Sequence, residues 1–502
     1  MEIGTISNVY LLIFLPLFAS LLCQIFQIRN ICFLISLATV VILIGLILKI
    51  FPDILIYEKI KNDYELSLLS ITLEFSLDLV GVIFLFLVVF LEFLMLIFYR
   101  SDIESALTKR NQANFYSVFL LNLFSLVGIL TSNNLFNLYL FIEIHSFAFF
   151  AIATISFNNK LLNISFKNFC LSSVSSILIL ICFFAIFLTF GELNFDKIVD
   201  NLFLLPANKI WFLFVILILF SLALIAKFFP LWQYFEKIKS TSLVASFLII
   251  DAFFIKILIG LFLTLKFIYF FFGNNFLFTQ YEFSPIMILL GFSLVIYSSI
   301  KLIKEDHLKL ICAFFSISNI GFMISAIGMQ SIESMQSLFF FLLNFSLVNF
   351  FIFLFASYIK KNYQSSSIDK IFKVVRDNNM CGIPLKLIII FVAGLPLTFL
   401  FFGYWYMALA SMDYSFRIIM IIALIFSNYA QLNIAMKIID SILEKHQPKN
   451  IQSYISANKN IDYLQIVSFW ILIITIYANA LLSGGVNSLA LRFASFLLAN
   501  TI

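Results

Sequence analysis

The sequence has few charged residues and no long polar stretch. Asp, Glu, Lys and Arg make up 11% of its 502 residues, whereas soluble domains carry about a quarter. The longest polar connections, at 52–75, 191–207, 360–381 and 440–460, are too short to form a soluble domain. Hydrophobic residues reach 63%. We therefore expect an all-α integral membrane protein in contact with the lipid bilayer along most of its length.

The sequence also lacks the motifs of several function classes. Its net charge is only +5 and it has no basic run, so we expect no nucleic-acid partner. It has no nucleotide loop, no flavin motif and no nucleophile–base pair, so we expect no catalytic residue in this chain. The six cysteines show no CxxC spacing and the three histidines are scattered. We therefore expect no metal and no cofactor, and we interpret the cysteines as packing residues.

Apolar segments long enough to cross a bilayer recur along the chain. The first lacks a basic region and a small-residue cleavage site, and an equal segment follows at once, so we expect a retained span rather than a cleaved signal. Window hydropathy predicts about 14 spans, at 7–27, 30–51, 76–99, 113–131, 134–157, 165–190, 208–235, 242–270, 284–303, 308–329, 335–359, 382–410, 415–439 and 461–483.

Basic residues are unevenly divided between alternate connections. Counted with the adjoining span ends, the odd-numbered connections carry 21 Lys and Arg residues, and the even-numbered connections with the C-terminal tail carry 8. Lys and Arg collect on the cytoplasmic side, so this bias predicts that both termini lie outside. We expect the cell (inner) membrane as the location. The tail at 485–502 is expected to form a short surface helix.

The segment 133–157 carries an acid where a span should be apolar. Glu143 lies near its middle, with apolar residues for most of a half-span on both sides, and His145 follows two positions later. A carboxylate at that depth costs a few kcal/mol or more unless it is paired, hydrated or protonated. The alternative is a shifted span with Glu143 at the interface. The apolar flanks favour a functional intramembrane acid, with His145 as a modulator.

Four further ionisable residues lie well inside predicted spans: Glu92, Lys227, Asp251 and Lys256. The near balance of acids and bases suits mutual pairing or a proton relay across a bundle interior. Burial readily neutralises a lysine, so a buried lysine can pass a proton on. For Asp251 and Lys256 a static ion pair stays open, although a separation of five residues is not an ideal helical facing. Glu92 is given no role.

Two predicted spans contain an interior proline. The seventh reads IAKFFPLWQYF around Pro230, and the twelfth reads VAGLPLTFLFFGYW around Pro396. Proline removes a backbone hydrogen bond and clashes with the carbonyl four residues back. A simple kink is one interpretation, since proline is common in membrane helices. Interrupted helices at corresponding places in two halves instead mark the ion pathway of a transporter built from repeats.

Four segments, in order, resemble motifs of one family. They are NLYLFIEIHSFAFFAI at 137–152, TFGELNFDKI at 189–198, EDHLKLICAFFSISNIGFMISAIG at 305–328 and AGLPLTFLFFGYW at 393–405. They are similar to segments of the antiporter-like subunits shared by respiratory complex I and the multi-subunit (Mrp-type) sodium/proton antiporters. The resemblance covers roughly residues 75–440.

The resemblance implies a fold and a proton path. The fold has two inverted repeats with interrupted helices 7 and 12, which divides the chain into 1–112 (helices 1–3), 113–270 (first repeat), 271–440 (second repeat) and 441–502 (helix 14 and tail). The path would use Glu143, Lys227 and Lys256. Asp251 is an unusual addition beside Lys256, and Asp251 and His145 are expected to act as modulators.

The sequence departs from the family in both halves. The family's seventh-span lysine stands five residues before the proline, where this chain has Ile225, and Lys227 stands only three before. In the second half, Phe345 and Asn349 replace the eleventh-span histidine and lysine, and Tyr404 replaces the twelfth-span lysine. Neither an amide nor a phenol readily changes charge near neutral pH. We therefore expect any conduction to use the first half.

The resemblance leaves several functions open. The leading hypothesis is a proton- or cation-translocating subunit working beside sister membrane subunits, closest to the D-type subunit of Mrp antiporters because HSFAFFA follows Glu143. The N-type subunit of complex I (NADH-quinone oxidoreductase) is the second branch, and any oxidoreductase activity would then belong to the assembly. A non-pumping structural paralogue and a solitary solute transporter are further alternatives. Whether the transported ion is Na+ or only the proton stays open.

Overall fold

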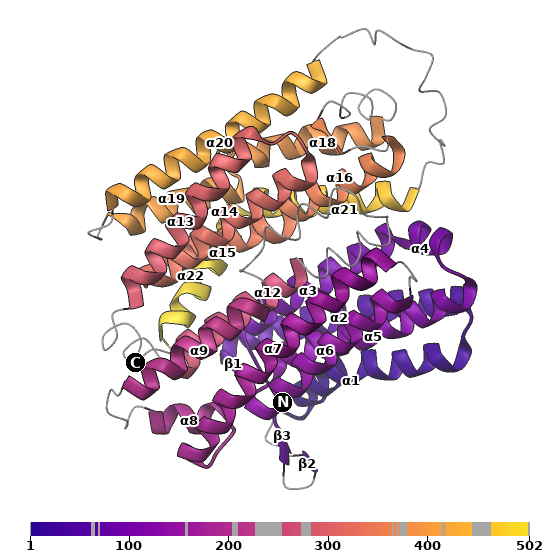
Figure 1. Cartoon of the computed structure of the whole chain (residues 1–502), viewed down its shortest axis with the longest axis vertical. Coiled ribbons are helices and arrows are strands. Elements are labelled where there is room, and N and C mark those ends of the chain that lie inside the picture. Colours follow the sequence, from indigo (N-terminus) through magenta and orange to yellow (C-terminus); the bar gives the residue numbers. More distant parts are fainter. Residues whose placement is uncertain are drawn as a thin grey trace. The chain divides into compact units, whose positions relative to one another are not determined.

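The structure is a computed structural model. It describes residues 2–61, 66–68, 71–155, 159–202, 209–225, 254–272, 283–363, 366–368, 371, 379–412, 414, 417–443 and 463–499. Their contacts divide them into two compact units, 2–272 (unit 1) and 283–498 (unit 2). Figure 1 shows that helices dominate both.

Unit 1 is a helical bundle with two small strand pairs. In it, α5 packs against α1, α2 and α6, and α7 packs between α6 and α9. Its elements are α1 (Glu2–Phe26), α2 (Arg29–Tyr57), β1 (Lys59–Lys61), β2 (Leu66–Leu68), β3 (Ile71–Leu73), β4 (Ser76–Asp78), α3 (Leu79–Phe98), α4 (Arg100–Ala106), α5 (Lys109–Thr131), α6 (Leu135–Ile155), α7 (Asn159–Phe190), α8 (Phe195–Leu202), α9 (Lys209–Ile225), α12 (Lys256–Leu265) and the π-helix η2 (Lys266–Phe272).

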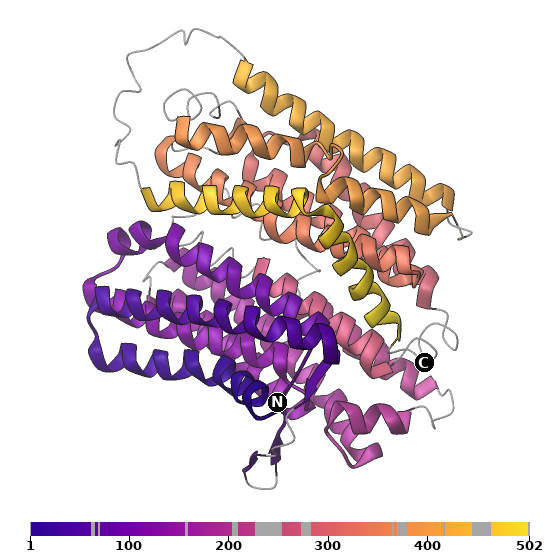
Figure 2. The same cartoon turned by 180° about the vertical axis from the view of Figure 1, so that it is seen from behind.

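Unit 2 is a second helical bundle. In it, α14 packs against α13, α15 and α16, and α21 meets α22 at a bend of 80° (Figure 2). Its elements are α13 (Phe283–Lys304), α14 (Leu308–Met329), α15 (Ile332–Leu343), the π-helix η4 (Asn344–Asn349), α16 (Phe350–Tyr363), α18 (Asn379–Val392), α19 (Phe399–Ser411), α20 (Arg417–Leu443), α21 (Tyr463–Leu481) and α22 (Ser483–Ala499). The helix predicted for the tail is α22.

The described residues include 10 helices long and apolar enough to span a membrane, or 11 if α21 and α22 form one bent span. Three shorter apolar helices, Leu213–Ile225, Met380–Val392 and Phe399–Ser411, fall in the predicted seventh and twelfth spans. The predicted seventh and eighth spans continue into residues outside the described ranges. The chain is therefore a multi-pass membrane protein, as composition predicts.

Burial separates central helices from peripheral ones. In α3 and α5, 83% of the most apolar window is buried, and the share is 94% in α14 and 100% in the span Ile332–Tyr363. It falls to 39% in α1 and α2, whose exposed side chains are large and apolar. Apolar helix surface exposed in this way suits lipid or a neighbouring membrane subunit. Polar groups on the central helices are instead enclosed by protein.

One end of unit 1 is closed by backbone bonding between three connections. β1 pairs with β4 and β2 with β3, both antiparallel, in a connection that the sequence does not mark as strand. The Asn133 amide donates to the Glu74 carbonyl (3.0 Å), and the Phe195 amide donates to the Asn133 carbonyl (3.0 Å). Residues 57–61, 71–78, 131–134 and 191–196 therefore meet at one end of the bundle, which we call the strand end.

The twelfth predicted span is interrupted where the sequence places the break. α18 ends at Val392 and α19 begins at Phe399. Between them Gly394 and Leu397 have φ of 66° and 75°, the left-handed region that most side chains avoid. Thr398 restarts the helix as its N-cap, accepting a hydrogen bond from the Phe401 amide at 3.2 Å. Pro396 thus lies in a true helix break. Pro230, the other predicted break, lies outside the described residues.

Candidate functional site

Lys256, the first residue of α12, is the centre of the candidate site in unit 1. Its side chain is only 3% exposed. The ammonium donates to Ser172 Oγ on α7 at 3.4 Å and lies 4.7 Å from the ring centroid of Phe149 on α6. A hydroxyl oxygen on α7 and an aromatic face on α6 therefore contact the ammonium.

His145 on α6 is held close to this lysine by a second buried polar side chain. It is 4% exposed, and its Nδ1 lies 2.8 Å from Asn122 Oδ1 on α5. A neutral imidazole has one donor nitrogen and one acceptor nitrogen, so a partner at Nδ1 sets both the tautomer and the ring orientation. Asn122 therefore acts as a positioning residue for His145.

A small cavity joins the lysine to the histidine. It has a volume of about 10 Å³ and is lined by polar groups of His145, Ser146, Ser172 and Lys256, with isoleucine side chains from four positions closing it. That volume is about the size of one water probe. The cavity is therefore large enough for about one water. Nothing in the sequence links Lys256 to His145. The two residues are brought together only by the packing of α6, α7 and α12.

Glu143 lies on a different face of α6 from His145. Two residues turn an α-helix by about 200°, and Glu143 is not among the residues that line the cavity. Its side chain is half-buried, and Tyr139, one turn earlier, interacts with it. The acid of the central motif therefore reaches the surface of this chain, whereas the histidine after it points inward.

Several residues singled out in the sequence cannot be placed at this site. Lys227 and Asp251 lie outside the described residues, so the proposed Lys227 relay and the Asp251 modulator stay predictions. Glu92 is described, and it is 1% exposed in α3. It takes part in interactions within the protein, and we assign it no role in transport.

Unit 2 has uncharged side chains at the places where the resemblance implies a second set of titratable groups. Phe345 and Asn349 are both completely buried in the π-helix η4. The Asn349 amide donates to Ser316 Oγ at 3.0 Å, and the Cys312 thiol donates to the Asn349 carbonyl at 3.0 Å. These contacts tie η4 to α14 without any charge.

A second neutral chain of hydrogen bonds runs through Tyr404. Its hydroxyl donates to Gln431 Oε1 at 2.7 Å and lies 2.9 Å from Ser427 Oγ, which in turn lies 3.1 Å from Ser318 Oγ. These groups connect α19, α20 and α14. Hydroxyl and amide groups can pass hydrogen bonds along a chain, but they do not gain or lose charge near neutral pH. Unit 2 therefore holds a polar network in place of a titratable one.

The structure encloses two further lysines. In the sequence both look like ordinary lysines at the ends of spans. Lys266 on η2 is 7% exposed, and Lys309 in the first turn of α14 is 1% exposed and lies 5.3 Å from the ring centroid of Phe353. A lysine near the end of an apolar run usually extends its ammonium to the membrane surface. Only tertiary packing reveals that these two are enclosed.

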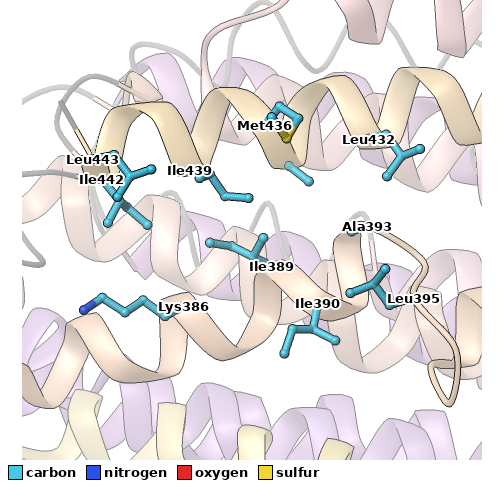
Figure 3. Close-up of a pocket in the computed structure, with 11 residues that line it drawn as sticks. Lys386, Ile389, Ile390, Ala393, Leu395, Leu432, Met436, Ile439, Ile442 and Leu443 are labelled. Carbon is cyan, nitrogen blue, oxygen red and sulfur yellow. The ribbon is translucent and has the colours of Figure 1, made fainter.

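A larger cavity in unit 2 has a different character. It measures about 490 Å³ and lies between α18 and α20 (Figure 3). Apart from Lys386 at one end, its lining is apolar, with side chains such as Ile389 and Met436 facing the groove. Passing a proton needs converging polar groups, so we place no part of the transport path there.

Residues 132–428 match the transmembrane family described as NADH:quinone oxidoreductase/Mrp antiporter, and this match covers more than half of the chain. The chain belongs to this antiporter-like family. The match includes α6 with Glu143 and His145, α12 with Lys256, and Tyr404 with Ser427 and Ser318, whereas Asn122 and Gln431 lie just outside it.

Relatives from both branches of the antiporter-like family are similar to the chain. NADH-quinone oxidoreductase subunit N of Pelagibacter ubique is 25% identical over 319 residues, which are 62% of this chain and 65% of that protein. The putative antiporter subunit mnhA2 of Staphylococcus haemolyticus is 22% identical over 262 residues, 52% of this chain and 32% of that protein. The chain thus spans less than two thirds of the length of either relative.

Two solved structures share the fold of this antiporter-like chain. One is the membrane-bound sulfane sulfur reductase, an archaeal respiratory membrane complex, with a TM-score of 0.79 and 18% identity over 98% of this chain and 99% of that chain. The other is the Mrp complex from Dietzia sp., with a TM-score of 0.79 and 14% identity over 99% of this chain and 98% of that chain. Both are multi-subunit membrane complexes.

Proposed function

We propose that this chain is a proton- or cation-translocating subunit of a multi-subunit membrane assembly, with sister membrane subunits as its partners. The observation that supports this most is the enclosed Lys256, which donates to a serine hydroxyl and shares a cavity with His145. Lysine and histidine can both gain and lose protons, and a single water between them would allow transfer.

In this proposal each group has a distinct task. Lys256 releases a proton to the cavity water, the second imidazole nitrogen of His145 accepts one from that water, and Asn122 keeps the imidazole in the right orientation. Glu143, on the half-buried face of α6, would take part in the proton path as the resemblance implies. Its change of charge would alter the free energy of the protonated lysine. The Lys227 step of the relay stays a prediction from the resemblance.

Two branches of the family are candidates for the assembly that contains this chain. The motif after Glu143 favours a chain like the D-type Mrp subunit, whereas the similarity to an N-type subunit favours the complex I branch. A third candidate is a structural paralogue that no longer pumps, and the uncharged side chains of Phe345, Asn349 and Tyr404 favour it. Adjacent genes for small antiporter subunits would indicate the first branch, and adjacent genes for Fe–S and flavin subunits the second.

The test of the proposal is ion-coupled transport by the reconstituted assembly. Glu143→Gln should abolish transport, because an amide cannot titrate, and Glu143→Asp should retain part of it. Unchanged transport in Glu143→Gln would remove Glu143 from any proton path. If the isolated chain were a stable monomer that exchanges cations in liposomes, the assembly proposal would fail and a solitary transporter would replace it.

The proposal includes an orientation in the cell (inner) membrane. The loop bias places both termini outside, so the strand end of unit 1, where the second, fourth and sixth connections meet, would face outward. A cysteine introduced in the connection 360–381 should react with an impermeant reagent only after the membrane is opened. Labelling from the outside of intact cells would overturn this orientation.

A further inference from the structure

Lys266 is an enclosed lysine that the proposed path through Lys256 does not use. It begins the π-helix η2 and is 7% exposed. Its ammonium donates to the Ser132 carbonyl and lies 4.8 Å from the ring centroid of Phe195 and 5.6 Å from that of Phe262. One carbonyl and two aromatic faces replace only part of the hydration that an ammonium has in water. Within the described part of the chain, these contacts enclose a cation without a carboxylate at ion-pair distance.

The groups around Lys266 lead from the interior to the surface. Asp78, Lys59 and Asp196 all act on it electrostatically. Lys59 Nζ lies 2.7 Å from Asp196 Oδ1, and the Asn133 amide donates to Asp196 Oδ2 at 3.0 Å. The side chains of Lys59 and Asp196 are 28% and 35% exposed, so this cluster reaches solvent. The buried ammonium therefore lies at the same end of unit 1 as the partly exposed carboxylate of Asp196.

Lys266 and Lys256 lie on one continuous helical segment. They are 10 residues apart in the sequence, which is roughly 15 Å along a helix. Lys256 opens into the inner cavity beside His145, and Lys266 lies at the strand end. π-helical turns of the kind that carries Lys266 occur frequently at functional sites. The segment therefore presents one enclosed lysine in the interior and another at an end of the bundle.

We propose that Lys266 is the group through which unit 1 exchanges protons with the outer surface. This inference rests on the proposed function, and it completes a path that is confined to unit 1. In the outward step the Lys266 ammonium gives a proton to a water between it and the carboxylates of Asp78 and Asp196, and becomes a neutral amine. The amine then takes up a proton from the interior of unit 1, which restores the ammonium.

The alternative is a static anchor, in which Lys266 only ties η2 to the Ser132 carbonyl. An anchor needs a side chain that keeps its charge, whereas an exchange group needs a side chain that can lose its proton. Arginine keeps the charge and can still donate to the carbonyl, but it does not lose its proton in proteins. Histidine titrates near neutral pH but is shorter and has a different geometry. Arginine should therefore rescue an anchor, and histidine should rescue an exchange group.

The experiment measures proton transport by the reconstituted assembly, normalised to the amount of this subunit incorporated. We expect Lys266→Met and Lys266→Arg to lower transport at least about tenfold, with Lys266→His recovering part of the loss. The matched control is Lys197→Met, which removes an exposed lysine, ion-paired with Glu192 at 3.6 Å, from the same end of unit 1. That variant should stay close to wild type. If Lys266→Met fails to assemble, the comparison of Lys266→Arg with Lys266→His decides the question.

Lys256→Met separates this inference from the proposed function. If Lys256→Met stops transport while Lys266→Arg transports normally, Lys266 is an anchor and only the present inference fails. If Lys256→Met transports normally, the proposed function itself fails. Loss of transport in both Lys256→Met and Lys266→Arg, with partial recovery in Lys266→His, supports both. Equal losses in Lys197→Met and Lys266→Met would show that general surface charge, and not Lys266, is responsible.

Discussion

Unit 1 and unit 2 are built in the same way but differ in the chemistry of their interiors. Each has helices enclosed on nearly all sides, and each contains a π-helix, η2 in unit 1 and η4 in unit 2. The interior of unit 1 holds a buried histidine and two buried lysines. At the places in unit 2 where the resemblance implies titratable groups, the side chains of Phe345, Asn349 and Tyr404 are neutral. Unit 2 therefore packs as a helical bundle without charge at these positions.

Lys309 is the exception that limits this comparison. It is buried in unit 2, but it lies in the first turn of α14, two residues after the N-cap residue His307. The Tyr404 network begins at Ser318, more than two turns further along the same helix. Lys309 therefore marks an end of the bundle rather than the centre of a relay. Substitutions in the two units test whether unit 1 alone conducts.

The largest effect is expected at the centre of unit 1. Lys256→Ala should lower transport by about a hundredfold or more, because it removes the titrating amine at the cavity beside His145. Transport by the reconstituted assembly is the measurement, and Asn349→Ala in unit 2 is the comparison. If Asn349→Ala were the more severe of the two, the working half would be unit 2.

A packing change should affect unit 2 without affecting the transport chemistry. α13 and α14 approach closely at Gly291, where an added Cβ would come within 2.3 Å of the Gly321 carbonyl oxygen and 2.2 Å of Ser325 Oγ. Gly291→Ala should destabilise the protein by about 1–3 kcal/mol, measured as thermal stability in detergent. Gly45→Ala in unit 1, where nothing lies within 4 Å, is the control.

The transport measured on Gly291→Ala decides what unit 2 does. If unit 2 is a scaffold, transport per assembled complex should stay near wild type despite the lower stability. A loss of transport in fully assembled Gly291→Ala complexes would instead show that unit 2 takes part in conduction.

The orientation of His145 should matter less than the charge of Lys256. Asn122→Leu removes the partner of Nδ1 and should lower transport by about tenfold, because the imidazole loses its fixed direction. The matched variant is Asn319→Leu in unit 2, which also replaces a completely buried asparagine and should change transport by less than about twofold. Similar losses in the two variants would point to a general effect of removing buried amides.

The smallest effects are expected in the neutral network of unit 2. Tyr404→Phe removes the hydroxyl that joins Ser427 and Gln431, and Asn349→Ala removes the bond to Ser316. Each should leave transport within about threefold of wild type, since neither side chain titrates near neutral pH. If Tyr404→Phe stops transport, the network itself carries protons and the contrast between the units disappears.

Sequence reasoning predicted the features that depend on local chemistry. Continuous apolar length predicts spanning helices, and Pro396 predicts the break between α18 and α19. Both are present. Glu143 could be singled out because a single acid contrasts with its apolar flanks. Its role is not tested by the structure, and it stays a prediction.

The features that sequence reasoning missed depend on packing between distant segments. His145 and Lys256 are 111 residues apart in the sequence, and nothing in the sequence indicates that they share a cavity. Lys266 and Lys309 look like span-end charges in the sequence, because burial depends on which helices cover them. The β1–β4 pair was missed because strands of three residues carry almost no pattern.

The strand end of unit 1 also limits the order in which the chain can fold. Its backbone bonds join Glu74 to Asn133 and Asn133 to Phe195, and so link three connections separated by about 60 residues each. Membrane helices are inserted from the N-terminus as synthesis proceeds. The bonds to Asn133 from both sides can be complete only after α7 has been inserted and α8 has emerged. This end can therefore close before α9, α12 and η2, which complete unit 1, have been made.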